Sequence, residues 1–195
     1  MAAIELQALR RSELGELARL LPASRAELAV QLVEPLHVLS LRHLPGGAQA
    51  LAAAAAMAGV ASLPGPGRCH GQDPWLVWRS ASEWLFVSTR AAAAEVVLQA
   101  LPADTQALAV AIDQSAGSIA FALQGPALDA LLHRLLDAEA VPGEPGLGSR
   151  ARLADIAVVA LRLAPQRAWL LADRGNDHYL AQWIAYASES LEATA

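Results

Sequence analysis

An internal similarity constrains the fold of this chain more than any other feature. Residues 75–87 (WLVWRSASEWLFV) and residues 156–172 (IAVVALRLAPQRAWLLA) each contain an apolar run, a short break and a second run that opens with Trp-Leu. Helix-period sequence follows both. Upstream, residues 37–44 lead through Pro-Gly-Gly into an Ala-rich helix, and residues 118–124 lead through Gly-Pro into a Leu-rich one. Self-similarity of this kind predicts one β-α-β-β-α unit written twice, with Trp84 and Trp169 in equivalent core sites.

Hydrophobic periodicity and turn residues place the expected elements along the chain. Strands are predicted at residues 36–44, 75–79, 84–88, 107–113, 118–124, 153–163 and 168–173, and helices at residues 48–58, 91–101, 127–137 and 176–188. The short loop after residue 113 predicts that the strands on either side of it are antiparallel neighbours. On the last helix, Tyr179, Leu180, Trp183 and Ile184 are expected to form one apolar stripe.

Helices beside antiparallel strand pairs predict an α+β fold, with both halves packed into one pseudo-twofold domain. That domain is expected to span residues 35–188 without an internal boundary. Residues 1–34 are charged and lack a clear apolar stripe, so they are expected to form an N-terminal arm with a short helix near residues 11–21. Residues 189–195 are expected to be a C-terminal tail.

The composition excludes several classes of function. All 14 basic residues are arginine, so a Schiff-base lysine and a P-loop phosphate site are both excluded. The net charge is −5 and no basic block occurs, which argues against nucleic acid as a partner. The N-terminus resembles no signal peptide, and the apolar residues 48–60 are shorter than the roughly 20 needed to span a bilayer. We therefore expect a cytoplasmic protein that does not associate with membranes.

Histidine and cysteine offer little chemistry. The five histidines are scattered, and His37 and His43 share a strand face but would lie roughly 20 Å apart, so no metal site is expected. The lone cysteine, Cys69, can form no internal disulfide. Cys69 and His70 could be a nucleophile and its base, but adjacent residues rarely aim at one point, and we favour a small buried thiol.

The remaining candidates have plainer explanations. Ser115 and Ser118 lie near Asp113, but the G-x-S-x-G motif is absent. The glycines at 143, 146 and 148 lack dinucleotide-binding spacing. An anion could bind Arg150, Arg152 and Arg162, although such a face is more often solvated or paired. A ligand could stack on Trp75, Trp78 and Trp84, although such residues more often fill a core or an interface. No catalytic, cofactor-binding or metal-binding residue is assigned.

Three segments, in order, resemble a known family. Residues 63–87 (LPGPGRCHGQDPWLVWRSASEWLFV), residues 111–136 (AIDQSAGSIAFALQGPALDALLHRLL) and residues 149–184 (SRARLADIAVVALRLAPQRAWLLADRGNDHYLAQWI) are similar to matching segments of the gamma subunits of heterotetrameric sarcosine oxidases. Together they lie within residues 36–188. The sequence departs from the family's Gly-Pro-Asp-Glu-Trp motif, keeping only Glu83, Trp84 and Leu85, and retains little beyond Leu-Asp in residues 133–137.

The resemblance implies a fold and a role. The fold would be that of the folate-binding aminomethyltransferase (T-protein) superfamily. The role would be that of a non-catalytic accessory subunit, with FAD, FMN, NAD and tetrahydrofolate in the alpha and beta subunits of a complex that oxidises an N-methyl amino acid such as sarcosine. The departures weaken the inference of substrate more than that of fold.

Two alternatives stay open. The chain could be a stand-alone T-protein-like folate-binding protein or one-carbon transferase, which needs a pocket between the halves and a carboxylate for the pterin. Asp113 is the nearest candidate carboxylate, although an aspartate at a strand end is more often a turn acceptor. The chain could also be a purely structural protein outside one-carbon metabolism.

Overall fold

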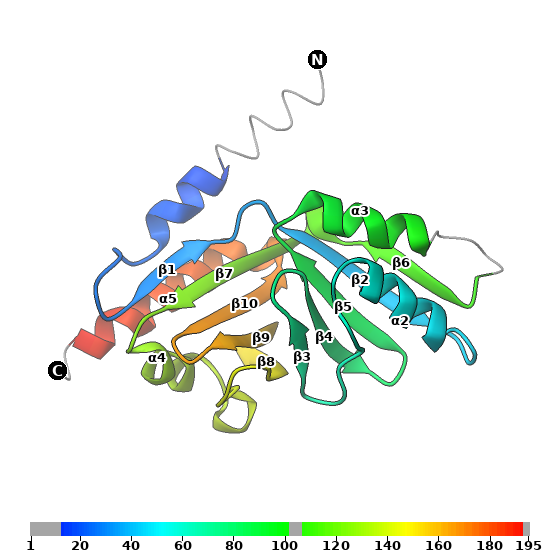
Figure 1. Cartoon of the computed structure of the whole chain (residues 1–195). Helices are drawn as coiled ribbons and strands as arrows, with labels where there is room; N and C mark the ends of the chain where they lie inside the picture. The colour runs from blue at the N-terminus through cyan, green and yellow to red at the C-terminus, as the bar shows by residue number, and fades with distance from the viewer. Residues whose placement is uncertain (1–12, 102–106, 193–195) are drawn as a thin grey trace, which may run out of the picture.

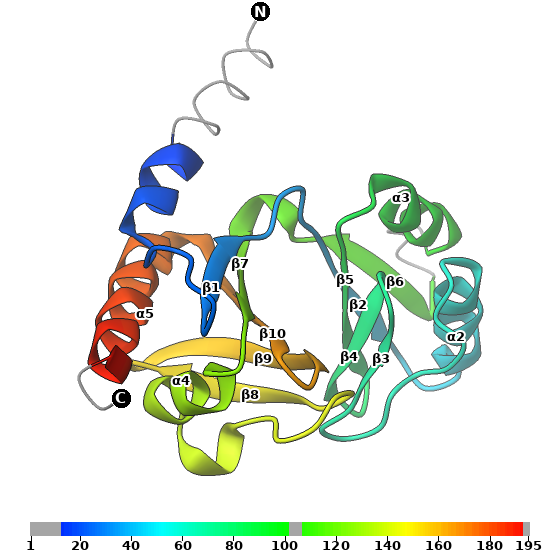
Figure 2. The ribbon, with the colours of Figure 1, turned by 60° about the vertical axis from the view of Figure 1, so that its left-hand side comes forward.

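The computed structural model describes residues 13–101 and 107–192. Two five-stranded antiparallel sheets face each other, and helices cover the outer face of each (Figures 1 and 2). This gives four layers in the order helix, sheet, sheet, helix. The α+β class predicted from the sequence is confirmed.

The N-sheet, as we call the sheet built mainly from the first half of the chain, has the strand order β3-β4-β5-β2-β6. Its strands are β2 (His37–His43), β3 (Cys69–Gly71), β4 (Trp75–Ser80), β5 (Glu83–Ser88) and β6 (Ala109–Asp113). Helices α2 (Ala48–Met57) and α3 (Ala91–Ala100) cover its outer face.

The C-sheet, built mainly from the second half, has the order β8-β9-β10-β7-β1. Its strands are β1 (Ala29–Leu32), β7 (Ser118–Gln124), β8 (Gly148–Leu153), β9 (Ile156–Ala164) and β10 (Arg167–Asp173). Helices α4 (Leu128–Leu135) and α5 (Asp177–Glu192) cover its outer face. Short 3₁₀ turns occupy Ser115–Gly117, Ala138–Ala140 and Arg174–Asn176.

The two sheets have the same strand order. The strands of the two sheets can be matched in five pairs: β6 with β1, β2 with β7, β3 with β8, β4 with β9, and β5 with β10. If the pairs are numbered one to five in this order, both sheets have the strand order three, four, five, two, one. The first strand of each half lies in the sheet of the other half: β1 pairs with β7, and β6 pairs with β2. The chain thus exchanges one edge strand between its halves, which ties the sheets together covalently.

Two glycines make matching close approaches where the exchanged strands begin. A Cβ atom on Gly47, after β2, would lie 2.1 Å from the carbonyl oxygen of Leu108, just before β6. A Cβ on Gly125, after β7, would lie 2.2 Å from the carbonyl oxygen of Glu27, just before β1. Because real Cβ atoms do not approach oxygen so closely, both positions require glycine.

Three apolar layers hold the fold together. One lies between the N-sheet and its helices, one between the C-sheet and its helices, and one between the two sheets. The middle layer is centred on Trp169 and Trp75, whose rings meet edge to face with centroids 4.5 Å apart. Aromatic pairs prefer this geometry over a face-to-face sandwich.

The strand and helix positions predicted from the sequence are largely confirmed, with three exceptions. β6 and β7 are not neighbours, because the turn at Ser115–Gly117 carries the chain from one sheet to the other. The predicted strand at residues 153–163 corresponds to β9, while its first residue ends β8, a strand that was not predicted; Ala154 and Asp155 between them adopt positive φ and reverse the chain. Residues 62–73, where no strand was predicted, contain the short strand β3.

The N-terminal segment is not a free arm over its described part. β1 forms the edge of the C-sheet, and Leu17 is buried in the outer layer of that sheet. The short helix predicted near residues 11–21 is present over the described residues 13–20. The prediction of an arm failed because a single buried leucine makes no visible stripe. At the other end, α5 continues to Glu192, past the expected start of the tail. The predicted stripe on α5 also divides, with Leu180 and Ile184 buried and Tyr179 and Trp183 exposed.

The predicted equivalence of Trp84 and Trp169 is wrong. Trp84 points to the outer layer under α2 and α3, where its Nε1 donates to the carbonyl oxygen of Pro64 at 2.9 Å. Trp169 points the other way, into the layer between the sheets, and its Nε1 is buried without a partner. Trp84 lies on β5 and Trp169 on β10, and these two strands are matched between the halves. Because side chains alternate along a strand, Trp84 points to the outer face of its sheet and Trp169 to the face between the sheets.

Candidate binding cavity between the two sheets

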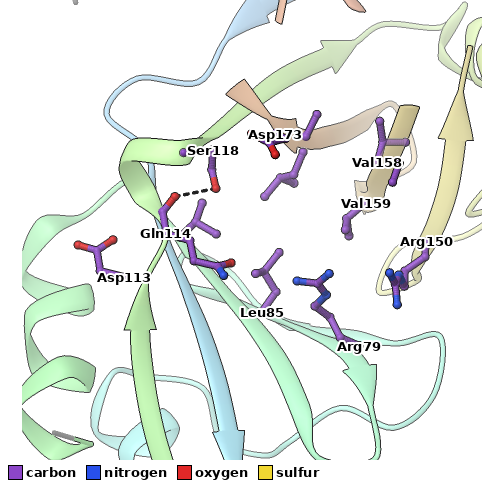
Figure 3. Close-up of a pocket in the computed structure, with 14 residues that line it drawn as sticks. Arg79, Leu85, Asp113, Gln114, Ser118, Arg150, Val158, Val159 and Asp173 are labelled. Atoms are coloured by element: carbon purple, nitrogen blue, oxygen red, sulfur yellow. Dashed lines mark hydrogen bonds between the residues drawn. The ribbon is translucent and has the colours of Figure 1, made fainter. Parts of the chain in front are cut away.

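A cavity of about 570 Å³ opens between the sheets, where β2, β4 and β5 face β8, β9 and β10 (Figure 3). Much of its wall is apolar and comes from both sheets. These apolar residues are Val38, Leu85, Ala157, Val158, Val159, Leu171 and Ala172. The volume is within the range of small-molecule sites, about 300–1,000 Å³.

Arg79 enters the cavity from a β-bulge. The pairing of β4 with β5 shifts between Trp78 and Ser80, so Arg79 is the extra residue on β4. Alternation along β4 places Arg79 on the same face as Val77, which lies between the sheets. The Nη1 of Arg79 lies 3.4 Å from Glu83, but its buried Nε has no hydrogen-bond partner among the described residues.

Arg150 approaches the same side of the cavity from the opposite sheet. It lies on β8, which contacts β4, and Figure 3 shows both guanidinium groups on that side. Within the described residues Arg150 makes no ion pair. The carboxylate of Glu83, which contacts Arg79, is shared with Arg42, and each arginine lies 3.4 Å from it. This side of the cavity therefore carries excess positive charge.

The other side of the cavity carries carboxylates that the backbone already holds. The Oδ1 of Asp113 accepts hydrogen bonds from the backbone N–H of Ser115 at 2.8 Å and from its hydroxyl at 2.6 Å. Ser118 donates to the carbonyl oxygen of Gln114 at 2.9 Å (Figure 3). The turn-acceptor interpretation of Asp113 is confirmed, and Ser115 and Ser118 serve the sheet-switching turn.

Cys69 and His70 do not form a catalytic pair. They are adjacent on β3 and point to opposite faces. The Cys69 thiol lies in the layer between the sheets, where burial raises its pKa to about 12, so it is not a thiolate near neutral pH. His70 instead contacts Ser62, with its Nδ1 3.1 Å from the hydroxyl.

The three arginines proposed as an anion-binding face are separated. Arg162 is buried, donates to Asp129 at 2.5 Å and also bonds the carbonyl oxygens of Ala164 and Pro165. Arg152 is exposed and lies 3.9 Å from Asp155. Only Arg150 lines the cavity between the sheets.

The tryptophans proposed as a stacking platform belong to apolar layers. Trp75 and Trp84 are buried, and Trp78 packs against the outer layer of the N-sheet. The described residues contain no group of three or more His, Cys, Asp or Glu placed to hold a metal ion. In the same part of the chain, no helix combines the length and apolarity that crossing a membrane requires.

Sequence reasoning missed the cavity and Arg79 as a lining residue. The sequence places Arg79 at the end of a strand, on the face of Trp75 and Val77, but it does not show that a cavity lies beside that face. The contact between β4 and β8 depends on how the two sheets pack, which no local pattern encodes. Arg150 was proposed as an anion ligand, and it does line the cavity.

Comparison with solved structures places the fold. A chain of heterotetrameric sarcosine oxidase from Corynebacterium sp. U-96, solved with pyrrole 2-carboxylate, superposes with a TM-score of 0.74 at 24% identity. The match covers 91% of each chain, so the two are nearly equal in length. Aminomethyltransferase T of the glycine cleavage system from Bartonella henselae matches with a TM-score of 0.55 at 17% identity, over 82% of this chain and 46% of that one.

Neither a family model nor a curated protein matches this sequence. The likeness to solved structures is therefore one of fold, and it extends over nearly the full length of the sarcosine oxidase chain. The chain thus has a T-protein-like fold, shared with a chain of heterotetrameric sarcosine oxidase and with part of aminomethyltransferase T.

Proposed function

We propose that this protein is the non-catalytic gamma-type subunit of a heterotetrameric flavoenzyme of the sarcosine oxidase kind. The observation that carries the proposal is the likeness in fold, over 91% of both chains, to a chain of such an enzyme. The structural roles of the candidate nucleophiles also support a non-catalytic subunit, because Cys69 is buried and the hydroxyls of Ser115 and Ser118 make hydrogen bonds within a turn.

In this proposal the chemistry resides in partner chains. Alpha and beta subunits would carry FAD, FMN, NAD and tetrahydrofolate, and the complex would oxidatively demethylate an N-methyl amino acid in the cytoplasm. The present chain would contribute a rigid body to the assembly. Its internal organisation fits a duplicated unit, since the strand order and the close approaches at Gly47 and Gly125 match between the halves.

Co-expression tests the proposal directly. The full chain, tagged, is expressed together with flavoprotein subunits encoded beside it, and the complex is isolated by affinity and size-exclusion chromatography. We expect one peak containing all chains, with flavin absorbance and sarcosine-dependent release of hydrogen peroxide. Elution of the chain by itself, with the flavin in a separate peak, would overturn the proposal.

The alternative of a stand-alone folate-binding protein or one-carbon transferase has one observation in its favour, the cavity between the halves. Its nearest candidate carboxylate for the pterin, Asp113, already accepts two hydrogen bonds from Ser115 through Oδ1. Saturable binding of tetrahydrofolate by the isolated chain would favour this alternative. Failure to bind it at millimolar concentration would dismiss the alternative and leave the subunit proposal unaffected.

A further inference from the structure

We propose that the cavity between the sheets binds a small organic carboxylate with a flat apolar body, and that Arg79 and Arg150 hold its carboxylate. This site lies within the chain itself and does not depend on the proposed subunit role. Three observations carry it: an unsatisfied buried donor, an excess of positive charge on one side of the cavity, and apolar walls of suitable size.

The unsatisfied donor is the Nε of Arg79. A buried donor without a partner is destabilising, and more so when the group is charged. Because Arg79 lines the cavity, an acceptor bound there can satisfy this donor. A carboxylate suits a guanidinium best, since its two oxygens match two parallel N–H groups.

The charge on that side of the cavity favours an anion. Arg42, Arg79 and Arg150 are balanced by one carboxylate, that of Glu83, which already contacts Arg42 and Arg79. Arg150 has no ion-pair partner in the described part of the chain. The cavity's own carboxylates lie on the other side in Figure 3, and Asp113 there is held by Ser115.

The apolar walls define the rest of the ligand. Leu85 and Leu171 come from opposite sheets and line the cavity together with Val38 and Val159. Side chains from two facing sheets bound a slot suited to a planar group, and a volume of about 570 Å³ accommodates two fused rings. A free inorganic anion would leave these walls in contact with water, so the organic acid is the better occupant.

The test uses 2-naphthoate as a probe and the full chain as the protein. Isothermal titration calorimetry is expected to show one saturable site. The neutral 2-naphthamide has the same apolar body without the charge, and we expect it to bind at least about tenfold more weakly, the loss of one charge-assisted hydrogen bond. Equal binding of acid and amide would overturn the role of the arginines, and no binding of either at millimolar concentration would overturn the site.

Matched variants locate the site. Arg79→Gln and Arg150→Gln are each expected to weaken 2-naphthoate binding by about tenfold or more, with little effect on 2-naphthamide. Arg152→Gln is the control, because Arg152 is on the same strand as Arg150 but pairs with Asp155 and does not line this cavity. We expect it to retain wild-type binding.

Arg150→Gln keeps the test decisive if Arg79→Gln fails to fold, because Arg150 is exposed and is not needed for packing. Thermal unfolding of each variant without ligand identifies such a failure. Unchanged affinity in Arg150→Gln, or an equal loss in Arg152→Gln, would show that general surface charge attracts the probe and would overturn the proposal.

Discussion

The outer layers of the two sheets have the same arrangement of elements but distribute side-chain volume differently. Under the N-sheet, the helices contribute mostly small residues, among them Ala54 and Ala55 of α2, while the strands contribute Trp84 and Phe86. Under the C-sheet, α4 contributes four leucines, and the strands contribute large residues such as Phe121 and Leu170 as well as small ones such as Ala160. Small helix residues thus meet large strand residues under the N-sheet, whereas under the C-sheet both the helices and the strands contribute large residues.

This comparison shows that strand order does not fix which side chain fills a given site. Interiors are packed to nearly uniform density, so what must hold is the summed volume of facing positions. The two halves meet this requirement in different ways, with the large residues coming mainly from the strands under the N-sheet and from both strands and helices under the C-sheet. The tryptophans on the matched strands likewise fill different sites, with Trp84 in an outer layer and Trp169 in the layer between the sheets.

The largest expected effect comes from the layer that both halves share. Trp169→Ala should lower the free energy of unfolding by about 3–5 kcal/mol, because Trp169 is 1% exposed and packs on Trp75. Denaturant unfolding measures this change. Trp183→Ala is the control, since Trp183 is 40% exposed and should cost far less. Similar losses in both variants would mean that Trp169 is not central to the packing of the sheets.

Conservative replacements distinguish the two tryptophan sites. Trp84→Phe removes the hydrogen bond to Pro64 and leaves that buried carbonyl without this donor, at a cost of about 1–3 kcal/mol beyond the lost packing. Trp169→Phe removes a donor that has no partner, so it carries no such penalty. Denaturant unfolding should therefore show the greater loss at Trp84, and the reverse order would contradict the assignment of these environments.

The different residues that α4 and α2 contribute to the outer layers predict different sensitivities to substitution. Leu131→Ala in α4 should cost about 2–5 kcal/mol by opening a cavity. Ala55→Leu in α2 should cost about 1–3 kcal/mol by overpacking, because Ala55 is fully buried against large strand residues. Both changes are measured by denaturant unfolding. A stabilising Ala55→Leu would show that the layer under α2 contains unfilled space.

These features also show what the sequence could and could not predict. Strong local sequence signals were sufficient to predict the hairpin of β4 and β5 and the helices α2, α3 and α5. The sheet change at Ser115–Gly117 was not predictable, because a tight antiparallel turn and a crossing between sheets both need only a short polar segment. β1 escaped detection since an edge strand of four residues has little periodicity. The cavity arises from packing between sheets, and of the two arginines that line it only Arg150 was singled out beforehand.

The close approaches at the exchanged strands should be sensitive in both halves. Gly47→Ala and Gly125→Ala should each cost about 1–3 kcal/mol, because the new Cβ would collide with a backbone carbonyl. Gly125 should be the more sensitive of the two, since its φ of +138° also disfavours a side chain. Gly175→Ala is the control, as nothing lies within 4 Å of a Cβ there. Thermal unfolding of the three variants measures these stability losses. A large loss at one of the two close-approach glycines and none at the other would show that the two exchanged strands contribute unequally to stability.

The smallest expected effect concerns Cys69, which lies between the sheets on the N-sheet side. Burial raises the pKa of its thiol from 9.0 to about 12, so above pH 9 the unfolded chain loses this proton while the folded chain keeps it. The unfolded state then binds fewer protons, and stability should fall by about 1.4 kcal/mol per pH unit until the pH approaches the folded pKa. Cys69→Ala lacks this contribution and serves as the reference in denaturant unfolding across this range. Identical slopes in both proteins would show that the thiol ionises in the folded state, and hence that water reaches the layer between the sheets.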